Sequence, residues 1–462
     1  MSETGASSVC HVCGHTNAMG SRFCAGCRTQ LLPAAGSPLV ARWRARARLR
    51  RTLVRAAAAV LALLVVTWAA VENIGLAHFL PDPASDLTSE LQLGGWPTGG
   101  GSPLRANAMP EAATSLAGEV AWKADLGASP GGGPVVLEDV VYTGNVDGCM
   151  HAFSASDGAP LWDRCLGAPV SSTPSIAGHL IYFGMLDGRI TALDRDDGSE
   201  VWTFRADAPV RSSPAVVDGV LYAGSSDRRL YALDALTGEE RWSFATEGRI
   251  TSGPAVNEQL VVVVSQDNLI HFIDRHTAKR WFDYETSLAD GSAAIAGDSV
   301  YAADISGTVR RVRWENRQWP FEKSIRNIRR WMFRWGMLDE LPPQKGVVWV
   351  RQERGESFTE TPAVDSERAY AGTAGGTVFA YDKQTGDTVW QTHLGTSAAT
   401  SPTVIGDEVV VGTQSGTIAS VDAATGEIRW RIEPGGGAIL GVAVGAGALY
   451  ATGASGLLVE IR

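Results

Sequence analysis

The sequence predicts an all-β fold, an eight-bladed β-propeller of four-stranded blades, because one tryptophan-containing unit repeats along it. The tryptophans stand about forty residues apart, at Trp122, Trp162, Trp202, Trp242, Trp281, Trp349, Trp390 and Trp430. In one clear copy, Val210 to Phe244, pairs of turn-forming residues separate four short runs of strand-forming residues. Four strands in a unit of about forty residues are typical of a propeller blade, whereas a βαβ solenoid needs helical periodicity between its strands.

The ends of the repeat predict how the ring closes. The last unit ends at Trp430, and Ala438 to Ile461 add three strands without a tryptophan. Glu119 begins a single strand that contains Trp122. Joining the two ends makes an eighth blade and leaves no exposed sheet edge, so we expect the propeller to cover 119–462.

The ending Asp-x-x-Thr-Gly-x-x-x-Trp closes three copies, at Asp234–Trp242, Asp382–Trp390 and Asp422–Trp430. The glycine suits a positive φ in the turn, and the tryptophan can fill the gap between neighbouring blades, which gives it a structural role. This ending resembles the PQQ-type repeat of the quinoprotein dehydrogenases and of the BamB family of outer-membrane assembly lipoproteins. The resemblance covers nearly all of the chain after residue 118 and implies the propeller, but a fold does not imply an activity.

Quinone chemistry is not expected. The resemblance implies that an enzyme of this kind carries a disulfide between adjacent cysteines, a calcium ion and a catalytic acid. No two cysteines are adjacent in this sequence, no Cys-x-x-Cys-His haem motif occurs, and no acidic cluster has calcium-loop spacing. We therefore predict no enzymatic activity, no catalytic residues and no bound PQQ.

Cys149 and Cys165 flank the turn Ser156-Asp157-Gly158 symmetrically. They should face each other on antiparallel strands, where a disulfide would need an oxidising compartment. Two small buried side chains remain the alternative interpretation.

A zinc ribbon is predicted for residues 1–32. Cys10, Cys13, Cys24 and Cys27 form two Cys-x-x-Cys pairs, the spacing with which four thiolates hold one tetrahedral Zn²⁺. So short a segment cannot bury enough surface to fold alone, so the metal would stabilise it. His11 and His15 are alternative ligands, and four cysteines leave no open position for catalysis.

A membrane anchor is predicted next. The basic segment 33–52 precedes a mostly apolar segment, 53–72, which we interpret as a single transmembrane helix with Trp68 at the far interface. A signal peptide is the competing interpretation, but its charged region would be over fifty residues long. Arginines before the span and acidic residues after it place the zinc ribbon in the cytoplasm and the propeller outside the inner membrane.

Residues 73–118 are rich in glycine and proline and are predicted to be a flexible linker. The chain has a net charge of −10 although residues 1–71 hold nine arginines and a single acidic residue. The exported part is therefore strongly acidic, which excludes nucleic acid as its expected partner.

The long interval between Trp281 and Trp349 predicts an insert at about 314–345, between the third and fourth strands of a blade. It reads as a basic amphipathic helix that begins near Pro320 and ends at Gly336. The residues expected to contact a membrane or a partner are Phe321, Ile325, Arg326, Ile328, Arg330, Trp331, Arg334 and Trp335. The insert and the tether should share one face of the propeller, towards the bilayer. A helix that packs on the propeller wall is the alternative.

We therefore expect a non-catalytic, membrane-anchored scaffold for protein–protein interaction, possible partners being components of cell-envelope assembly. Two other functions stay open: a PQQ-dependent dehydrogenase, and a ligand sensor that signals through the zinc ribbon.

Overall fold

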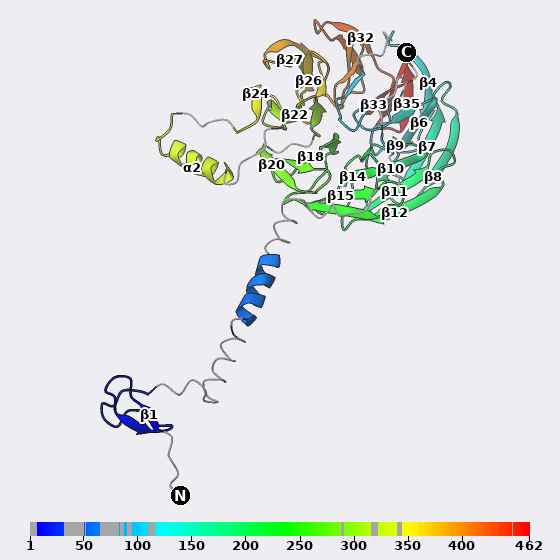
Figure 1. The fold of residues 1–462 in the computed structure, drawn as a ribbon. Helices are drawn as coiled ribbons and strands as arrows, with labels where there is room; N and C mark the ends of the chain where they lie inside the picture. Colours follow the sequence, from blue (N-terminus) through cyan, green and yellow to red (C-terminus); the bar gives the residue numbers. More distant parts are fainter. Residues whose placement is uncertain are drawn as a thin grey trace. The chain divides into compact units, whose positions relative to one another are not determined.

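The computed structural model describes residues 7–31, 50, 52–64, 83, 87–89, 95–109, 116–287, 291–315, 322–339, 344–445 and 447–462. The chain forms two compact units, Met1–Gly75 and Leu76–Arg462. Figure 1 shows the second unit as a ring of small sheets around one axis.

Eight antiparallel blades make up that ring, which confirms the predicted fold class. Each blade has an inner strand at the axis and an outer strand at the rim. The strands of blades 1 to 4 are β5 (Val135–Leu137), β6 (Val140–Gly144), β7 (Cys149–Ser154) and β8 (Pro160–Cys165); β9 (Ser175–Ala177), β10 (Leu180–Gly184), β11 (Arg189–Asp194) and β12 (Glu200–Arg205); β13 (Ala215–Val217), β14 (Val220–Gly224), β15 (Arg229–Asp234) and β16 (Glu240–Ala245); and β17 (Ala255–Val256), β18 (Leu260–Ser265), β19 (Leu269–Asp274) and β20 (Arg280–Glu285).

The other four blades follow the same plan. Their strands are β21 (Ala294–Ala296), β22 (Ser299–Asp304), β23 (Thr308–Arg313) and β24 (Val347–Gln352); β25 (Ala363–Val364), β26 (Arg368–Gly372), β27 (Thr377–Asp382) and β28 (Thr388–His393); β29 (Thr403–Ile405), β30 (Glu408–Gly412), β31 (Ile418–Asp422) and β32 (Ile428–Ile432); and β33 (Ile439–Gly445), β34 (Ala448–Gly453), β35 (Leu457–Ile461) and β4 (Val120–Asp125).

Blade 8 closes the ring as predicted, with its outer strand taken from the beginning of the domain. β4 pairs antiparallel with β35, so that Trp122 lies opposite Glu460. The backbone of Glu119 and that of Arg462 also exchange hydrogen bonds of 3.0 and 2.9 Å. Both ends of the propeller are therefore held in one sheet.

Most of the repeated tryptophans join neighbouring blades by a hydrogen bond, whereas Trp281 and Trp430 donate to Asp274 and Glu408 of their own blades. Trp202 donates its indole N–H to the carbonyl of Ala235 in the next blade at 2.9 Å, and Trp122, Trp162, Trp349 and Trp390 make the equivalent bond. The glycine of the next blade's turn lies against the ring: a Cβ on Gly238 would stand 2.6 Å from Trp202. The turn glycine thus supplies both a positive φ, 75° at Gly238, and room for the indole.

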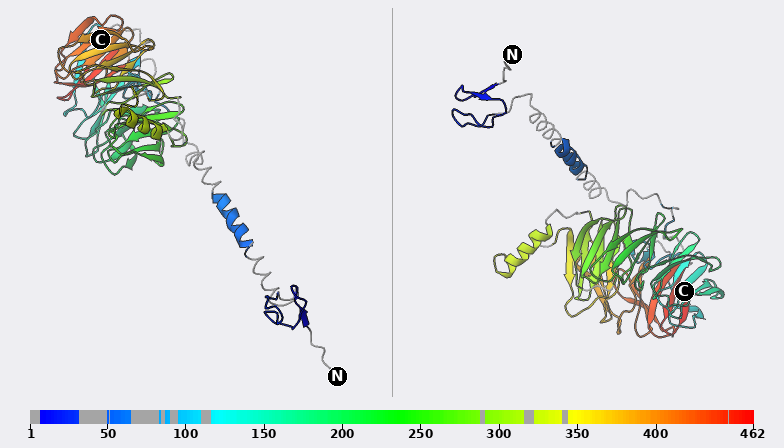
Figure 2. Two further views of the ribbon diagram at one scale, coloured as in Figure 1. Left: turned by 90° about the vertical axis from the view of Figure 1, so that its left-hand side faces the viewer. Right: turned by 90° about the horizontal axis from the view of Figure 1, so that it is seen from below.

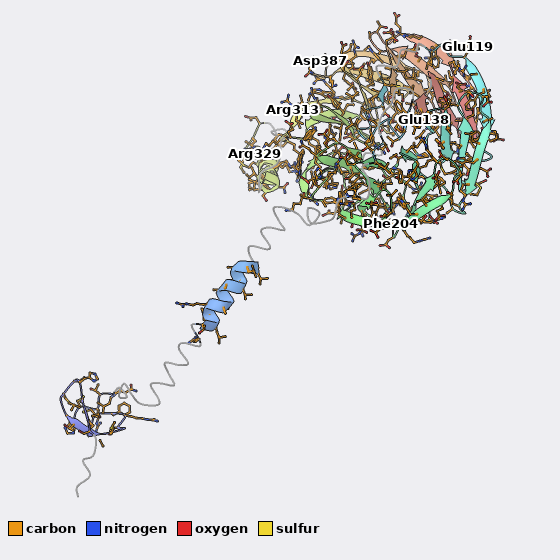
Figure 3. The ribbon with its side chains drawn as sticks, turned by 45° about the vertical axis from the view of Figure 1, so that its right-hand side comes forward. Glu119, Glu138, Phe204, Arg313, Arg329 and Asp387 are labelled. Atoms are coloured by element: carbon orange, nitrogen blue, oxygen red, sulfur yellow. A yellow bond between two sulfur atoms is a disulfide. The ribbon has the colours of Figure 1, made fainter. Side chains whose placement is uncertain are left out.

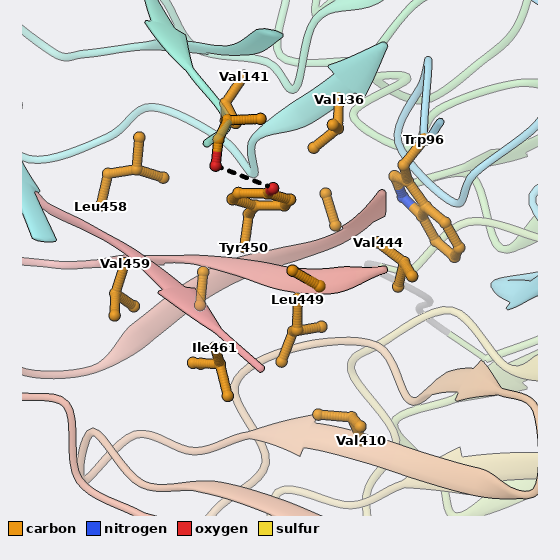
Figure 4. Packing of buried hydrophobic residues seen from close by; sticks show 14 of the residues in the cluster. Trp96, Val136, Val141, Val410, Val444, Leu449, Tyr450, Leu458, Val459 and Ile461 are labelled. Carbon is orange, nitrogen blue, oxygen red and sulfur yellow. Dashed lines mark hydrogen bonds between the residues drawn. The ribbon is translucent and has the colours of Figure 1, made fainter. Parts of the chain in front are cut away.

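The linker prediction is wrong for residues 95–109, which we call the axial segment. Within it, β3 (Ala108–Met109) adds a parallel fifth strand to blade 7. Trp96 is 1% exposed and packs among the inner residues of blades 1 and 8, including Val136 and Val444 (Figure 4). The rest of the predicted linker lies outside the described residues except Pro83, Leu87–Ser89 and 116–118.

In the first unit, β1 (Ser7–Val9) and β2 (Thr16–Ala18) form a two-stranded hairpin, and residues 52–64 are helical. None of the helices in the described ranges is long and apolar enough to cross a membrane. The predicted span covers residues 53–72, and the part of it after residue 64 lies outside the described residues.

Candidate functional site

Four cysteine thiols meet in the first unit. The Sγ atoms of Cys10, Cys13, Cys24 and Cys27 all lie within 4.8 Å of one another. Asn17 donates its side-chain N–H to the Cys24 sulfur at 3.6 Å, and the Gly26 backbone N–H donates to it at 3.3 Å. Donors of this kind stabilise a thiolate, so the donor set and its surroundings fit a tetrahedral zinc ion.

The other two cysteines are joined. Cys149 in β7 lies directly opposite Cys165 in β8, with their Cα atoms 3.9 Å apart, and the pair forms a disulfide. It crosses the two outer strands of blade 1 at the rim.

A cavity of about 360 Å³ lies on the propeller axis. Every blade contributes to its wall, and the residues that occupy the equivalent position in or just before the eight inner strands are Gly133, Thr173, Ser213, Gly253, Ser292, Thr361, Ser401 and Gly441. Trp96 and Arg105 of the axial segment also line it. The cavity is therefore polar and is shared by all eight blades.

The hydroxyls of this ring link each blade to the previous one. Thr173 accepts the backbone N–H of Gly133 at 2.9 Å, and Ser213 accepts that of Thr173 at 3.1 Å. Ser292, Thr361 and Ser401 continue the pattern on the other side of the axis. Because each hydroxyl accepts here, its own proton is left to donate.

Arg105 occupies the gap that Gly253 leaves in the ring. A Cβ on Gly253 would stand 2.1 Å from the Arg105 guanidinium carbon. The guanidinium donates to the carbonyls of Pro254 (2.9 Å), Gly99 (3.0 Å) and Ser213 (2.5 Å). Burial lowers the pKa of Arg105 to about 10, so the side chain is still a cation at neutral pH.

The axial segment also saturates the inner edges of the blades. Val256, Ile295 and Val364 belong to the inner strands of blades 4, 5 and 6. Their N–H groups donate to the backbone carbonyls of Pro103, Leu104 and Ala106, respectively, and each of these hydrogen bonds is 2.8 Å long. Inner-strand N–H groups would otherwise face the axis unpaired.

Neither the ring nor the axial segment was anticipated from the sequence. The signal was present, because the ring residues recur with nearly the same spacing as the tryptophans and most precede a proline. The axial segment has no comparable signal, since its glycines and prolines are equally typical of a linker.

The insert forms the expected helix, α2 (Glu322–Arg334), and Gly336 follows it with a φ of 67°. Figure 1 and the right-hand view of Figure 2 show α2 beside the rim, projecting away from the blades. Its attachment is ionic: Arg326 donates to the Glu285 carboxylate at 2.6 Å and Arg330 at 3.0 Å. The side chain of Gln344 bonds to the backbone of Glu285 (3.2 Å) and Asp283 (2.5 Å) at the free edge of β20.

The apolar face of α2 points away from the propeller. Ile325, Ile328, Trp331 and Trp335 are 47%, 58%, 54% and 69% exposed. On a helical wheel they lie opposite Arg326 and Arg330, which face Glu285. The apolar face therefore does not pack on the propeller wall, whereas Arg326 and Arg330 attach the other face of the helix to Glu285 of that wall. Arg334 is exposed at the end of the helix, and Phe321 lies outside the described residues.

The insert and the tether meet the propeller on one face, as expected, but α2 itself runs along the rim. The chain reaches the propeller at Leu87–Ser89, where the Gly219 N–H donates to the Leu87 carbonyl, on the face of the first-to-second and third-to-fourth turns. The insert leaves β23 at Arg313 on that face (Figure 3). Glu285, however, is the last residue of the outer strand β20 and therefore lies on the opposite face of the propeller. Because α2 is attached to Glu285, the helix runs along the rim.

A family model described as outer membrane protein assembly factor BamB matches residues 111–214, 186–319 and 335–461. No curated protein is significantly similar to the chain in sequence.

Solved propellers share the fold. BamB from Moraxella catarrhalis is 18% identical, with a TM-score of 0.60 over 74% of this chain and 97% of its own. Quinohemoprotein alcohol dehydrogenase from Comamonas testosteroni is 15% identical, with a TM-score of 0.61 over 80% of each chain. A europium-containing methanol dehydrogenase is 14% identical, with a TM-score of 0.62 over 78% of this chain and 89% of its own.

Proposed function

We propose a function from one premise: the chain belongs to the family of the outer membrane protein assembly factor BamB. In this proposal the present chain is a non-catalytic scaffold that acts in the assembly of the cell envelope. It binds a protein partner through the exposed apolar face of α2. The observation that carries this proposal is the outward orientation of that face, which the Arg326 and Arg330 pairs with Glu285 maintain.

A protein groove suits this face better than a bilayer does. Ile325, Ile328 and Trp335 have the spacing with which amphipathic helices enter apolar grooves. Two of the basic side chains are already paired with Glu285 and are turned away from the apolar face. Arg329 and Arg334 are exposed, so the complementary groove is apolar with an acidic rim.

Site-specific photocrosslinking of the full-length chain in native membranes tests the proposal. A crosslinker at Ile328 should give a discrete protein adduct that Trp335→Glu abolishes, and the same crosslinker at Leu161, an exposed residue of β8, should not. The captured protein, once purified, should bind the native chain more tightly than Trp335→Glu. Adducts with lipid alone, or the same adduct from Leu161, would refute a protein partner.

The membrane anchor and the zinc site complete the proposed arrangement. The segment 53–72 tethers the propeller outside the inner membrane, and the cytoplasmic ribbon holds a structural Zn²⁺ through Cys10, Cys13, Cys24 and Cys27. One zinc per chain by elemental analysis, lost in Cys24→Ser, is the expected result for the ribbon.

The rival function is a PQQ-dependent dehydrogenase. Trp96 and Arg105 line the cavity that all blades share at the propeller axis. Dye reduction by the full-length chain after addition of PQQ and calcium would favour the rival.

A further inference from the structure

A second cavity, of about 390 Å³, lies between blades 4 and 5 and the underside of α2. Its volume is in the range of small-molecule sites, about 300–1,000 Å³. Three guanidinium groups line it: Arg310 from β23, and Arg326 and Arg330 from α2. The remaining lining groups are mainly hydroxyls and amides, with Glu285 as the acidic member.

The charges of this cavity do not cancel. Arg326 and Arg330 share the single carboxylate of Glu285. Arg310 pairs with Asp304, a buried residue whose pKa is held low because Arg310 and several hydrogen bonds outweigh the opposing effect of burial. Among the described residues, three cations therefore face two anions, which leaves one positive charge for a ligand.

Two N–H donors of the arginines that line the cavity have no partner among the described residues. They are the Nε atoms of Arg310 and Arg326, and both are buried. The Arg310 residue is only 5% exposed. A buried donor of a charged group without a partner is costly to maintain, so its presence twice in one cavity indicates an acceptor that binds there.

Blade 5 departs from the repeat at this place. Where β23 has Arg310, the equivalent strands β11, β15 and β27 have Thr191, Tyr231 and Phe379, and β7 and β19 have His151 and His271. The position of Asp304 is occupied by serine in blades 3 and 4, at Ser225 and Ser265. The buried pair is thus specific to the blade that carries the insert, and blade architecture does not require it.

We propose that this cavity binds the phosphate group of an organic phosphate. A tetrahedral oxyanion offers several acceptors, and guanidinium groups bind such oxyanions with directed, charge-assisted hydrogen bonds. The guanidinium groups of Arg310, Arg326 and Arg330, which line the cavity, supply these bonds. The volume beyond the phosphate accommodates the group that it esterifies, beside the ring of Tyr284.

Calorimetric titration of the full-length chain with sn-glycerol 3-phosphate tests the site. Arg326→Gln should weaken saturable binding by about tenfold or more, because it removes a charge-assisted donor. Arg329→Gln is the matched control: it removes the same charge from an exposed position on the same helix and should change the Kd by less than about twofold. Arg330→Gln gives an independent second variant, and circular dichroism checks that each remains folded.

Vesicles of phosphatidylcholine with and without phosphatidic acid distinguish the source of the phosphate. Binding of the soluble ester assigns a free metabolite, whereas binding only to vesicles that contain phosphatidic acid assigns a lipid headgroup. Equal losses in Arg326→Gln and Arg329→Gln, or no saturable binding of either probe, would overturn the site. Trp335→Glu should leave phosphate binding intact, so failure of this site and failure of the α2 docking surface are separable.

Discussion

The axial segment and the insert are both departures from the repeat, and they contribute opposite things to the propeller. The axial segment contributes backbone carbonyls and the buried side chains of Trp96 and Arg105 to the centre, where every blade meets it. The insert attaches to one blade through Glu285 and exposes its tryptophans. A tryptophan in one segment therefore maintains the fold, whereas a tryptophan in the other is available for a partner.

Replacing one tryptophan in each segment should give the largest contrast. Trp96→Ala removes a fully buried indole from the packing of blades 1 and 8 and should lower the free energy of unfolding by about 3–5 kcal/mol. Trp331→Ala removes an exposed side chain and should change it by about 0.5 kcal/mol or less. Denaturant unfolding of the full-length chain measures both, and equal effects would mean that the axial segment is not part of the folded core.

The gap at Gly253 permits a sharper test of the axial segment. Gly253→Ser alone places a Cβ on the Arg105 guanidinium and should cost about 1–3 kcal/mol, typical of overpacking. Combined with Arg105→Ala, the new serine has room to complete the hydroxyl ring. The double variant should therefore be less destabilised than the sum of the single variants by about 1–3 kcal/mol. Simple additivity in the double-mutant cycle would show that Arg105 does not substitute for the missing hydroxyl.

These contrasts also explain what the sequence could predict. Blade number, ring closure at Trp122 and the helix near 322–334 all follow from periodicity, which depends on local sequence alone. The course of residues 95–109 depends on carbonyls that meet distant strands, such as Leu104 with Ile295, and no local pattern encodes such pairing. The buried Arg310 could have been noticed as an arginine at a blade position that holds no arginine in the other blades, but its cavity forms only when α2 covers it.

Loosening the insert should leave the core unchanged. Glu285→Gln removes the carboxylate that Arg326 and Arg330 share at a partly exposed site, so the free energy of unfolding should change by less than about 1 kcal/mol. Amide hydrogen exchange in α2 should accelerate, because its ionic attachment is lost. Exchange in the axial segment should stay the same; Arg105 and Asn107, whose N–H groups donate to the carbonyls of Ser102 and Gly100, are the internal controls. Unchanged exchange in α2 would mean that other contacts hold the helix.

Two histidines at equivalent blade positions should have opposite effects on the pH dependence of stability. His271 lies in blade 4, which supports the insert, and His151 lies in blade 1, which packs against Trp96. In blade 4, burial alone would lower the pKa of His271, but hydrogen bonds to Asp267 (3.0 Å) and Asp283 (2.8 Å) outweigh it and raise the pKa. His271 therefore stabilises the fold fully below its unfolded pKa of about 6.5, and this contribution is lost as pH rises through the higher folded pKa.

In blade 1 the sign is reversed. Burial lowers the pKa of His151 more than Asp163 raises it, so protonation opposes folding and stability increases as pH rises towards about 6.5. His271→Gln removes the stabilising charge and should flatten the loss of unfolding free energy above about pH 6.5, and His151→Gln should flatten the gain below that pH. Chemical denaturation across the pH range distinguishes the two. If both variants shifted the profile in the same direction, the carboxylates around His271 would not be the cause of its raised pKa. The ion pair of His271 with Asp283 would then not stabilise β20, the strand that carries Glu285.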